Sequence, residues 1–177
     1  MAIDKEAPSS FLVESCLLTF GLASIGGAEL AREWRAAGAD DAVICWIEEG
    51  DIVAGTLERY LTFRAGAPRY KFALDSLERA RKEKLTGALT ASATMEVCRR
   101  FGVPVAVSCG IGGIGDVKGE EVCIDLAAIR DSGVVLVCTS PKDMLDIRET
   151  VSWLLREGVR VVGDGADTCT GYIFNGK

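Results

Sequence analysis

Hydrophobic residues run without a polar break through residues 134–138, a pattern typical of a strand that is covered on both faces. A Ser-Pro-Lys turn follows, in which Ser140 stands at a helix N-cap position and Pro141 at the first helical position. Apolar residues then recur at helical spacing until Gly158, which marks the end of the helix. The apolar stripe consists of Met144, Leu145, Ile147, Val151, Leu154 and Leu155. The segment predicts a buried strand, a turn and an amphipathic helix, before a second buried strand.

The same alternation continues along the rest of the chain. Strands that alternate with helices predict an α/β domain, with a mostly parallel central sheet flanked by helices in an α/β/α sandwich. We expect a loose lead-in at residues 1–10 and a single domain at residues 11–177, long enough to bury roughly 70% of its unfolded surface. Strands are expected at residues 11–19, 87–89 and 104–108, a hairpin from residues 42–47 and 52–54, and helices at residues 28–37, 76–84 and 94–101.

The composition argues against several classes of protein. The formal net charge is −6 and the basic residues are dispersed, which argues against a nucleic-acid surface. No apolar run approaches the length of a membrane span, and the polar start lacks the apolar region of a signal peptide. The seven cysteines show no paired spacing, so we expect free thiols in a cytoplasmic protein. A hydrophobic content of 49% favours an apolar interface between subunits.

The chain has no histidine, which removes the usual general base and makes a zinc site improbable. Acid-base chemistry must then fall to carboxylates, lysines, tyrosines or thiols. Lys142 is a candidate nucleophile, because the peptide dipoles in the first turn of the predicted helix disfavour an ammonium group and favour the neutral amine. Taken alone, a lysine that swings into water at a loop is the better explanation.

A glycine loop at residues 110–115 fits the G-x-G-x-x-G pattern and follows a predicted strand. A dinucleotide fingerprint would also need a helix that opens at once and an acidic residue about 20 positions later. The loop instead continues into a second polar loop, which disfavours an NAD(P)-dependent oxidoreductase. A tight loop whose bare backbone N–H groups face an anion or a neighbouring chain fits better. Sites of such sheets lie beyond the strand ends, which here are residues 14–21, 90–93, 108–115 and 139–142.

Five motifs occur together in one order. They are Leu-Val-Glu-Ser-Cys around Glu14, a lysine at Lys71, Gly-Ala-Leu-Thr-Ala-Ser-Ala-Thr-Met at residues 87–95, the glycine loop, and an Asp-Leu pair at Asp125 followed by the strand and turn that lead to Lys142. On these residues the sequence resembles the pseudouridine-5'-phosphate glycosidases, the family that includes the indigoidine synthase A proteins. The resemblance covers about residues 11–163.

The resemblance implies a site. Lys142 would form a Schiff base with the opened ribose 5-phosphate, and Glu14 would donate a proton. Glu14 lies in an apolar run, where burial favours the neutral acid; a buried glutamate paired with an amide or an arginine is the alternative. A divalent metal, usually Mn²⁺, would bind at Glu121. The implied contacts with the sugar phosphate or base come from Lys71, Ala91, Ser108, Cys123, Ile124 and Asp125. The resemblance further implies a homotrimer.

The chain departs from the family pattern at several of these positions. Glu121 replaces the aspartate that binds the metal, and Cys123-Ile124 replaces Ser-Ala. The basic residues after the glycine loop and after Lys71 are absent, and family members continue well beyond residue 163. We therefore expect a shortened, divergent glycosidase or lyase that cleaves or forms a C-glycosidic bond of a ribose 5-phosphate. The alternative is a non-catalytic sugar-phosphate-binding or assembly protein on the same fold. The acidic segment at residues 164–167 is interpreted as a solvated turn rather than a metal loop.

Overall fold

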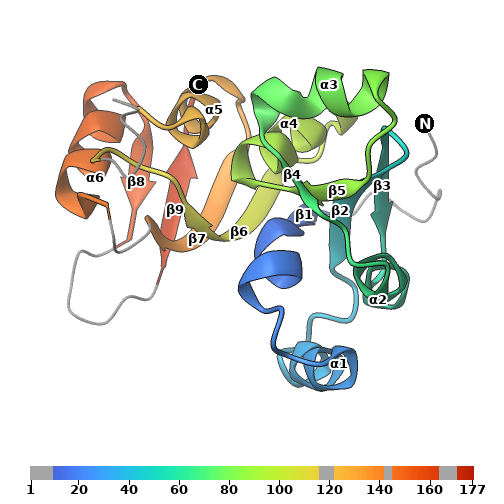
Figure 1. Cartoon of the computed structure of the whole chain (residues 1–177). Coiled ribbons are helices and arrows are strands. Elements are labelled where there is room, and N and C mark those ends of the chain that lie inside the picture. The colour runs from blue at the N-terminus through green and yellow to red at the C-terminus, as the bar shows by residue number, and fades with distance from the viewer. Residues whose placement is uncertain (1–9, 116–121, 142–144, 164–170) are drawn as a thin grey trace.

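The computed structural model describes residues 10–115, 122–141, 145–163 and 171–177. They form a nine-stranded sheet with helices packed against it (Figure 1). The strands are β1 (Phe11–Glu14), β2 (Val43–Glu48), β3 (Asp51–Gly55), β4 (Tyr70–Phe72), β5 (Gly87–Leu89), β6 (Val105–Ile111), β7 (Val135–Pro141), β8 (Arg160–Val162) and β9 (Tyr172–Asn175). The helices are α1 (Gly27–Ala36), α2 (Leu57–Ala65), α3 (Leu77–Lys82), α4 (Ala91–Phe101), α5 (Ile124–Asp131) and α6 (Ile147–Arg156), together with the π-helix η1 (Leu17–Gly21) and the 3₁₀-helix η2 (Leu74–Ser76).

The strands lie in the order β4-β5-β2-β1-β6-β7-β9-β8, and β3 also pairs with β2. The centre of the sheet, β2-β1-β6-β7, is parallel. Strands β3 and β5 run antiparallel to β2, and β9 runs antiparallel to β7. The first strand lies inside the sheet, because Leu12 pairs with Val43 of β2 and with Ala106 of β6. The predicted fold class, a mostly parallel sheet flanked by helices, is confirmed.

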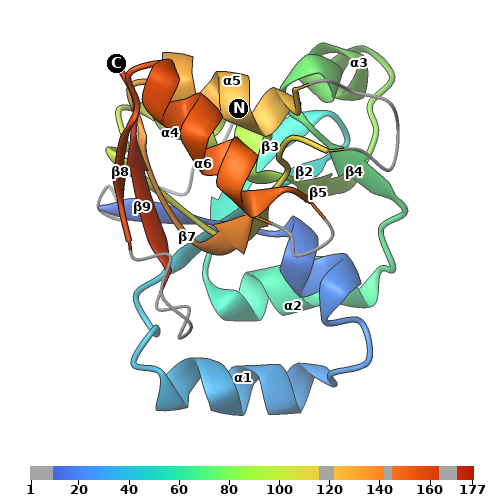
Figure 2. The ribbon, with the colours of Figure 1, turned by 90° about the vertical axis from the view of Figure 1, so that its left-hand side faces the viewer.

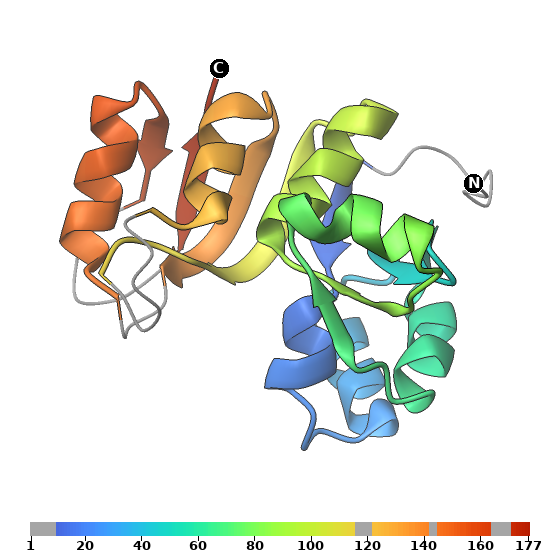
Figure 3. The same ribbon diagram turned by 45° about the horizontal axis from the view of Figure 1, so that its top comes forward.

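Two apolar cores lie on the two faces of the sheet. The larger core packs α3, α4, α5 and α6 against one face and contains Leu136 of β7 and Phe174 of β9, both fully buried. The smaller core packs α1, α2 and η1 against Ile44 and Trp46 of β2. Figure 2 shows α5 and α6 together on one side of β7, β9 and β8, and Figures 2 and 3 show α1 and α2 away from these strands. The larger core covers most of one face, whereas the smaller core covers only the β1-β2-β3 end of the other.

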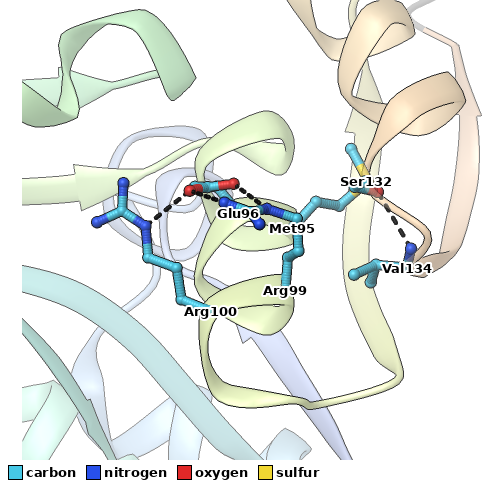
Figure 4. Close-up of polar contacts among 6 residues, drawn as sticks. All are labelled: Met95, Glu96, Arg99, Arg100, Ser132 and Val134. Atoms are coloured by element: carbon cyan, nitrogen blue, oxygen red, sulfur yellow. Dashed lines mark hydrogen bonds and ion pairs between the residues drawn. The ribbon is translucent and has the colours of Figure 1, made fainter.

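Polar contacts fix helix α4 (Figure 4). Glu96 accepts hydrogen bonds from Nε of Arg99 at 2.8 Å and from Nε of Arg100 at 2.7 Å, and the hydrogen bond from Arg99 is the main cause of the lowered pKa of this carboxyl. Just after α5, the Ser132 hydroxyl contacts the Met95 sulfur at 3.9 Å and accepts the N–H of Val134 at 3.2 Å. The Met95–Ser132 contact therefore joins the middle of α4 to the segment between α5 and β7.

Most predicted elements are present, with ends shifted by a few residues. The strand after the last helix was predicted as buried, but β8 is exposed at Arg160 and Val162. Two predicted element ends are also wrong. The strand expected at residues 11–19 ends at Glu14, and the π-helix η1 follows it. The chain turns there because the Thr19 N–H donates to the Ser15 carbonyl at 2.9 Å, while Leu18 packs into the smaller core. The apolar residues of this run therefore serve two elements rather than one strand.

The helix expected to begin at Pro141 is the second wrong prediction. Strand β7 continues through Pro141, which pairs with Ile111 of β6, and α6 begins at Ile147. Asp146 is the N-cap, because its carboxylate accepts the Glu149 N–H at 2.8 Å. The Ser140 hydroxyl bonds instead to the Pro141 carbonyl. The helix-dipole argument for Lys142 therefore does not hold.

The cysteines in the described part of the chain are free thiols. Cys45, Cys98 and Cys138 are buried, whereas Cys109 is exposed. Burial raises the pKa of the Cys98 thiol to about 12. Within the described ranges, no helix is long and apolar enough to cross a membrane.

Candidate functional site

A buried carboxyl–hydroxyl pair lies where β1 and β6 run side by side. Glu14 ends β1 and is 8% exposed, and Ser108 on β6 is 4% exposed. The Ser108 hydroxyl hydrogen bonds to the Glu14 carboxylate. The same hydroxyl lies 2.8 Å from the Gly110 carbonyl oxygen and 3.2 Å from the Gly110 nitrogen. The two predicted site residues are therefore in direct contact, at the point where the glycine loop begins.

The next residue along β6, Cys109, lies close enough to the Glu14 carboxylate to be affected by its charge. Cys109 is exposed as a residue, but its thiol loses solvation, and this loss together with the charge of Glu14 raises the thiol pKa. A raised pKa keeps the thiol protonated at neutral pH, so Cys109 is a poor nucleophile. Of the groups at the Glu14 end of the site, the carboxyl is the one suited to proton transfer.

Ser15, the residue after β1, is hydrogen-bonded to the end of β5, which leads into α4. Its hydroxyl accepts the Leu89 N–H at 2.9 Å, and both residues are fully buried. Thr90 follows as the N-cap residue of α4, and Ala91 is the first helical residue, 2% exposed. The backbone at Ala91, predicted to contact the base, therefore lies next to the end of β1.

Asp125, in the first turn of α5, holds two backbone segments with one carboxylate. Its Oδ1 accepts the Ser92 N–H at 3.0 Å, and its Oδ2 accepts the Gly112 N–H at 2.9 Å. The residue is only 9% exposed. A carboxylate at the N-terminus of α4 also complements the helix dipole. Asp125 was predicted to hold the sugar phosphate, whereas its two oxygens are engaged with the backbone of the site.

The glycine loop is packed rather than open. A Cβ on Gly112 would lie 2.1 Å from the Cys123 sulfur, and a Cβ on Gly113 would lie 2.5 Å from the Thr150 hydroxyl oxygen. That hydroxyl also accepts the Ile114 N–H at 2.9 Å. Glycine is required at these positions because other parts of the chain approach closely, which explains the motif without a dinucleotide.

Cys123 and Ile124 lie at the start of α5, as the N-cap residue and the first helical residue. Both are half-buried. The Cys123 sulfur lies against the glycine loop, at the contact with Gly112. The predicted segment 123–125 is thus next to the loop, with Asp125 as the residue that joins them.

Lys71 lies on β4, which is the first strand in the order of the sheet. The side chain is exposed, and its ammonium nitrogen lies 4.7 Å from the ring centroid of Phe20 on η1. Such a contact between a cation and an aromatic face is attractive. It brings Lys71 to the π-helix that follows Glu14. Phe20 lies in the segment 14–21 that was predicted to follow a strand end, but it was not singled out, because residues 11–19 were predicted as one strand.

Two predicted site residues, Lys142 and Glu121, lie outside the described residues. Within the part of the chain that the structure describes, no three acidic or cysteine side chains gather to hold a metal ion. Asp125, the buried carboxylate nearest the loop, has already engaged its oxygens. The described residues therefore do not fit a manganese site, and the metal stays a prediction that depends on Glu121.

The polar groups form a continuous series along one edge of the larger core. It runs from Ser108 and Glu14 through Ser15 and the start of α4 to Asp125 and the glycine loop. The arrangement offers a buried acid, a glycine loop and the first turn of α4, the last two held by Asp125. Ser15 and Ser92 were not singled out as site residues, although both lie inside the motifs that were.

Comparison with known proteins agrees with this arrangement. Residues 10–175 match the family described as indigoidine synthase A like protein. A pseudouridine-5'-phosphate glycosidase from Methylobacterium nodulans is 33% identical over 175 residues, which covers 94% of this chain and 51% of that relative. A second one, from Chloroflexus aurantiacus, is 31% identical and is matched over 54% of its length. The chain spans about half the length of the curated relatives it matches.

Two solved structures have the same fold. The indigoidine synthase A-like protein of Thermotoga maritima superposes with a TM-score of 0.73 at 26% identity, over 90% of this chain and 56% of that one. The prealnumycin C-glycosynthase AlnA, solved with ribulose 5-phosphate, gives a TM-score of 0.73 at 24% identity. The family match covers nearly the whole sequence, and the motif residues lie together in the fold. The chain therefore belongs to the indigoidine synthase A-like protein family.

Proposed function

We propose that this chain carries the reactive site of an enzyme that cleaves or forms a C-glycosidic bond of a ribose 5-phosphate. The observation that carries the proposal is the buried Glu14–Ser108 pair, together with Asp125, which holds the glycine loop and the first turn of α4. Relatives named pseudouridine-5'-phosphate glycosidase, and the C-glycosynthase solved with a pentulose phosphate, support this substrate class.

The geometry of the pair supports Glu14 as the acid. Its carboxyl lies at the end of β1 and the residue is only 8% exposed. The Ser108 hydroxyl donates to this carboxyl and accepts the Gly110 N–H at 3.2 Å, so Ser108 holds the carboxyl in one place at the start of the glycine loop. A carboxyl that is held in a fixed position and kept from bulk water is suited to deliver a proton to a bound substrate.

The chemistry calls for an amine as well as an acid. A C–C glycosidic bond has no basic leaving atom, so protonation alone does not cleave it. The neutral Lys142 amine attacks C1 of the sugar, and the ring oxygen leaves and takes a proton. The base carbon then takes a second proton and departs with the electrons of the C–C bond. The nitrogen lone pair forms the imine to C1, and water hydrolyses it to ribose 5-phosphate and free amine.

Other residues serve binding. Lys71, held beside Phe20, would be a point charge for the phosphate. Asp125 acts through the backbone segments it joins, so its role is to position the amides at Ser92 and Gly112. No step is assigned to a metal ion.

A second candidate is a non-catalytic sugar-phosphate-binding or assembly protein. The observation that favours it is Asp125, whose two carboxylate oxygens accept backbone N–H groups within the protein rather than facing a substrate. On this alternative, ribose 5-phosphate stabilises the protein against heat but forms no covalent bond.

The two candidates are separated by trapping the imine. The protein is mixed with ribose 5-phosphate and borohydride, and its intact mass is measured. We expect one adduct with the mass of the sugar phosphate less one oxygen atom. Lys142→Ala should abolish it, whereas the matched control Lys82→Ala, on the exposed face of α3, should retain it. An adduct that survives Lys142→Ala, or none in the wild type, would contradict the proposed chemistry.

A further inference from the structure

The π-helix η1 places an aromatic ring shortly after the end of β1. Leu18 and Thr19 of this helix are buried, whereas the next residue, Phe20, is half-buried. The Thr19 hydroxyl shares a buried hydrogen bond of 2.9 Å with the Tyr60 hydroxyl of α2, which holds the turn against the smaller core. Turns of π-helix are rare and occur frequently at functional sites. The fixed turn therefore determines where the Phe20 ring lies.

Lys71 of β4 reaches this ring from another part of the sheet. Its neighbour Phe72 is 3% exposed in the larger core, so the alternation of a strand directs Lys71 to the opposite face, on which η1 packs. The Lys71 Nζ lies 4.7 Å from the centroid of the Phe20 ring. The quadrupole of an aromatic face attracts an ammonium group at this distance. The contact restricts a side chain that has large rotamer freedom when it is exposed.

Backbone pairing holds the strand of Lys71 next to the candidate site. Strand β4 pairs with β5, and the Leu89 N–H of β5 donates to the Ser15 hydroxyl at 2.9 Å. The Thr90 N–H, at the start of α4, donates to the Phe72 carbonyl at 3.0 Å. The ammonium group therefore belongs to a strand that is connected by hydrogen bonds both to the end of β1 and to the start of α4.

No acid neutralises the charge of Lys71 among the described residues. Its ammonium group makes no ion pair with a described carboxylate, in contrast to Arg79 and Arg99, each of which pairs with a nearby glutamate. A ring face attracts the cation but leaves its full charge, and the N–H groups directed away from the ring remain available to an anion. A carboxylate in the same place would instead repel a phosphate group.

We propose that Phe20 is a positioning residue for phosphate binding, because its ring holds the Lys71 ammonium group where it receives the phosphate of the sugar. The proposal rests on the proposed function, since it assigns Lys71 to the phosphate of the same ligand. A lysine that is already ordered loses less conformational entropy when the phosphate binds, so the ring contact raises the affinity. Phe20 acts on binding through Lys71 and takes no part in proton transfer at Glu14.

Isothermal titration calorimetry with ribose 5-phosphate tests the proposal, in a Lys142→Ala background in which Lys142 forms no imine. Phe20→Leu keeps an apolar side chain but has no aromatic face, and it should raise the dissociation constant about 3- to 10-fold. Phe20→Tyr keeps the face and should restore the original affinity. The matched control is Phe101→Leu, the same change at a half-buried ring at the end of α4, which should leave the dissociation constant unchanged.

A double-mutant cycle separates positioning from a general structural effect. Lys71→Met removes the charge, and in that background Phe20→Leu should change the dissociation constant by less than about twofold, because the ring then has no cation to hold. With Lys142 present, Phe20→Leu should also raise the concentration of ribose 5-phosphate that gives half-maximal trapping by borohydride, and leave the rate at saturation unchanged.

Three results would overturn the proposal. One is a Phe20→Leu variant that binds ribose 5-phosphate as tightly as the protein with Phe20. Another is a loss of affinity that is the same with and without Lys71, and the third is a protein with Phe20 and Lys71 that does not bind the sugar phosphate at all. Binding that Phe20→Leu weakens, in a protein that forms no borohydride adduct, contradicts the proposed chemistry alone and supports the role of Phe20.

Discussion

Asp125→Ala should be among the most destabilising single substitutions in the site. The carboxylate is the acceptor for two backbone N–H groups, those of Ser92 and Gly112, at 3.0 and 2.9 Å. Each buried N–H left without an acceptor costs about 1–3 kcal/mol, so the two together cost about 2–6 kcal/mol. Loss of the negative charge at the N-terminus of α4 adds up to about 1 kcal/mol. The sum is a large share of the roughly 5–15 kcal/mol that stabilises a typical domain.

Urea unfolding followed by far-UV circular dichroism measures this free energy, with linear extrapolation to water. Asp125→Asn keeps one acceptor oxygen and should lose about half as much. Asp131→Ala is the matched control on the same helix, because Asp131 is exposed and bonds only to Arg130 among the described contacts. It should lose under about 1 kcal/mol. A loss below about 0.5 kcal/mol for Asp125→Ala, or an equal loss for Asp131→Ala, would refute the reasoning.

Three further predictions concern the loop, the core and the acid. Gly112→Ala places a Cβ 2.1 Å from the Cys123 sulfur, so it should destabilise by about 1–3 kcal/mol in urea melts, and Cys123→Gly should restore part of the loss. Burial raises the Cys98 pKa from 9.0 to about 12, so the unfolded chain ionises first as pH rises. The contribution of Cys98 to stability is therefore full below about pH 9 and is lost above it at about 1.4 kcal/mol per pH unit, so the fall in stability with pH should be shallower in urea melts of Cys98→Ala. Ser108→Ala removes the partner of Glu14 and should slow imine trapping about tenfold or more without loss of fold, whereas Ser108→Thr should retain the rate.

Much of the fold was predictable because the buried strands and amphipathic helices carry strong local patterns. The hairpin of β2 and β3 and the stop of α4 at Gly102, whose φ is 68°, follow from turn chemistry alone. Elements without a clear hydrophobic period were not predicted. Helix α2 buries Leu57, Tyr60 and Phe63, although its sequence shows no regular apolar stripe. Strand β9 forms by pairing with the edge of β7, which its own sequence does not indicate.

Competition between two local signals explains the misplaced helix start. By sequence pattern alone, Ser140 and Pro141 form a good helix N-terminus. In the structure, pairing of Pro141 with Ile111 extends the strand. Asp146 caps the helix instead, closer to the apolar stripe. The long-range strand pairing outweighs the local preference for a helix start at Pro141, as is common in folded proteins.

The site was predictable in its members but not in its geometry. Glu14, Ser108 and Asp125 were identified from motifs, which carry residue types and order. That Glu14 and Ser108 touch requires strands 94 positions apart in sequence to be neighbours. The engagement of Asp125 with backbone amides depends on where α4 and the loop end, which no local pattern encodes.

The central position of β1 has a consequence for synthesis. Strand β1 is made before both of its neighbours, so it can pair with β2 early, through Leu12 and Val43, but its other edge stays unpaired until β6 has been made. At typical elongation rates that delay is on the order of ten seconds. During this interval the nascent chain presents an open apolar strand edge, a target for chaperones or for wrong pairing. Slow translation between residues 55 and 105 should therefore lower the yield of folded protein more than slow translation after residue 141.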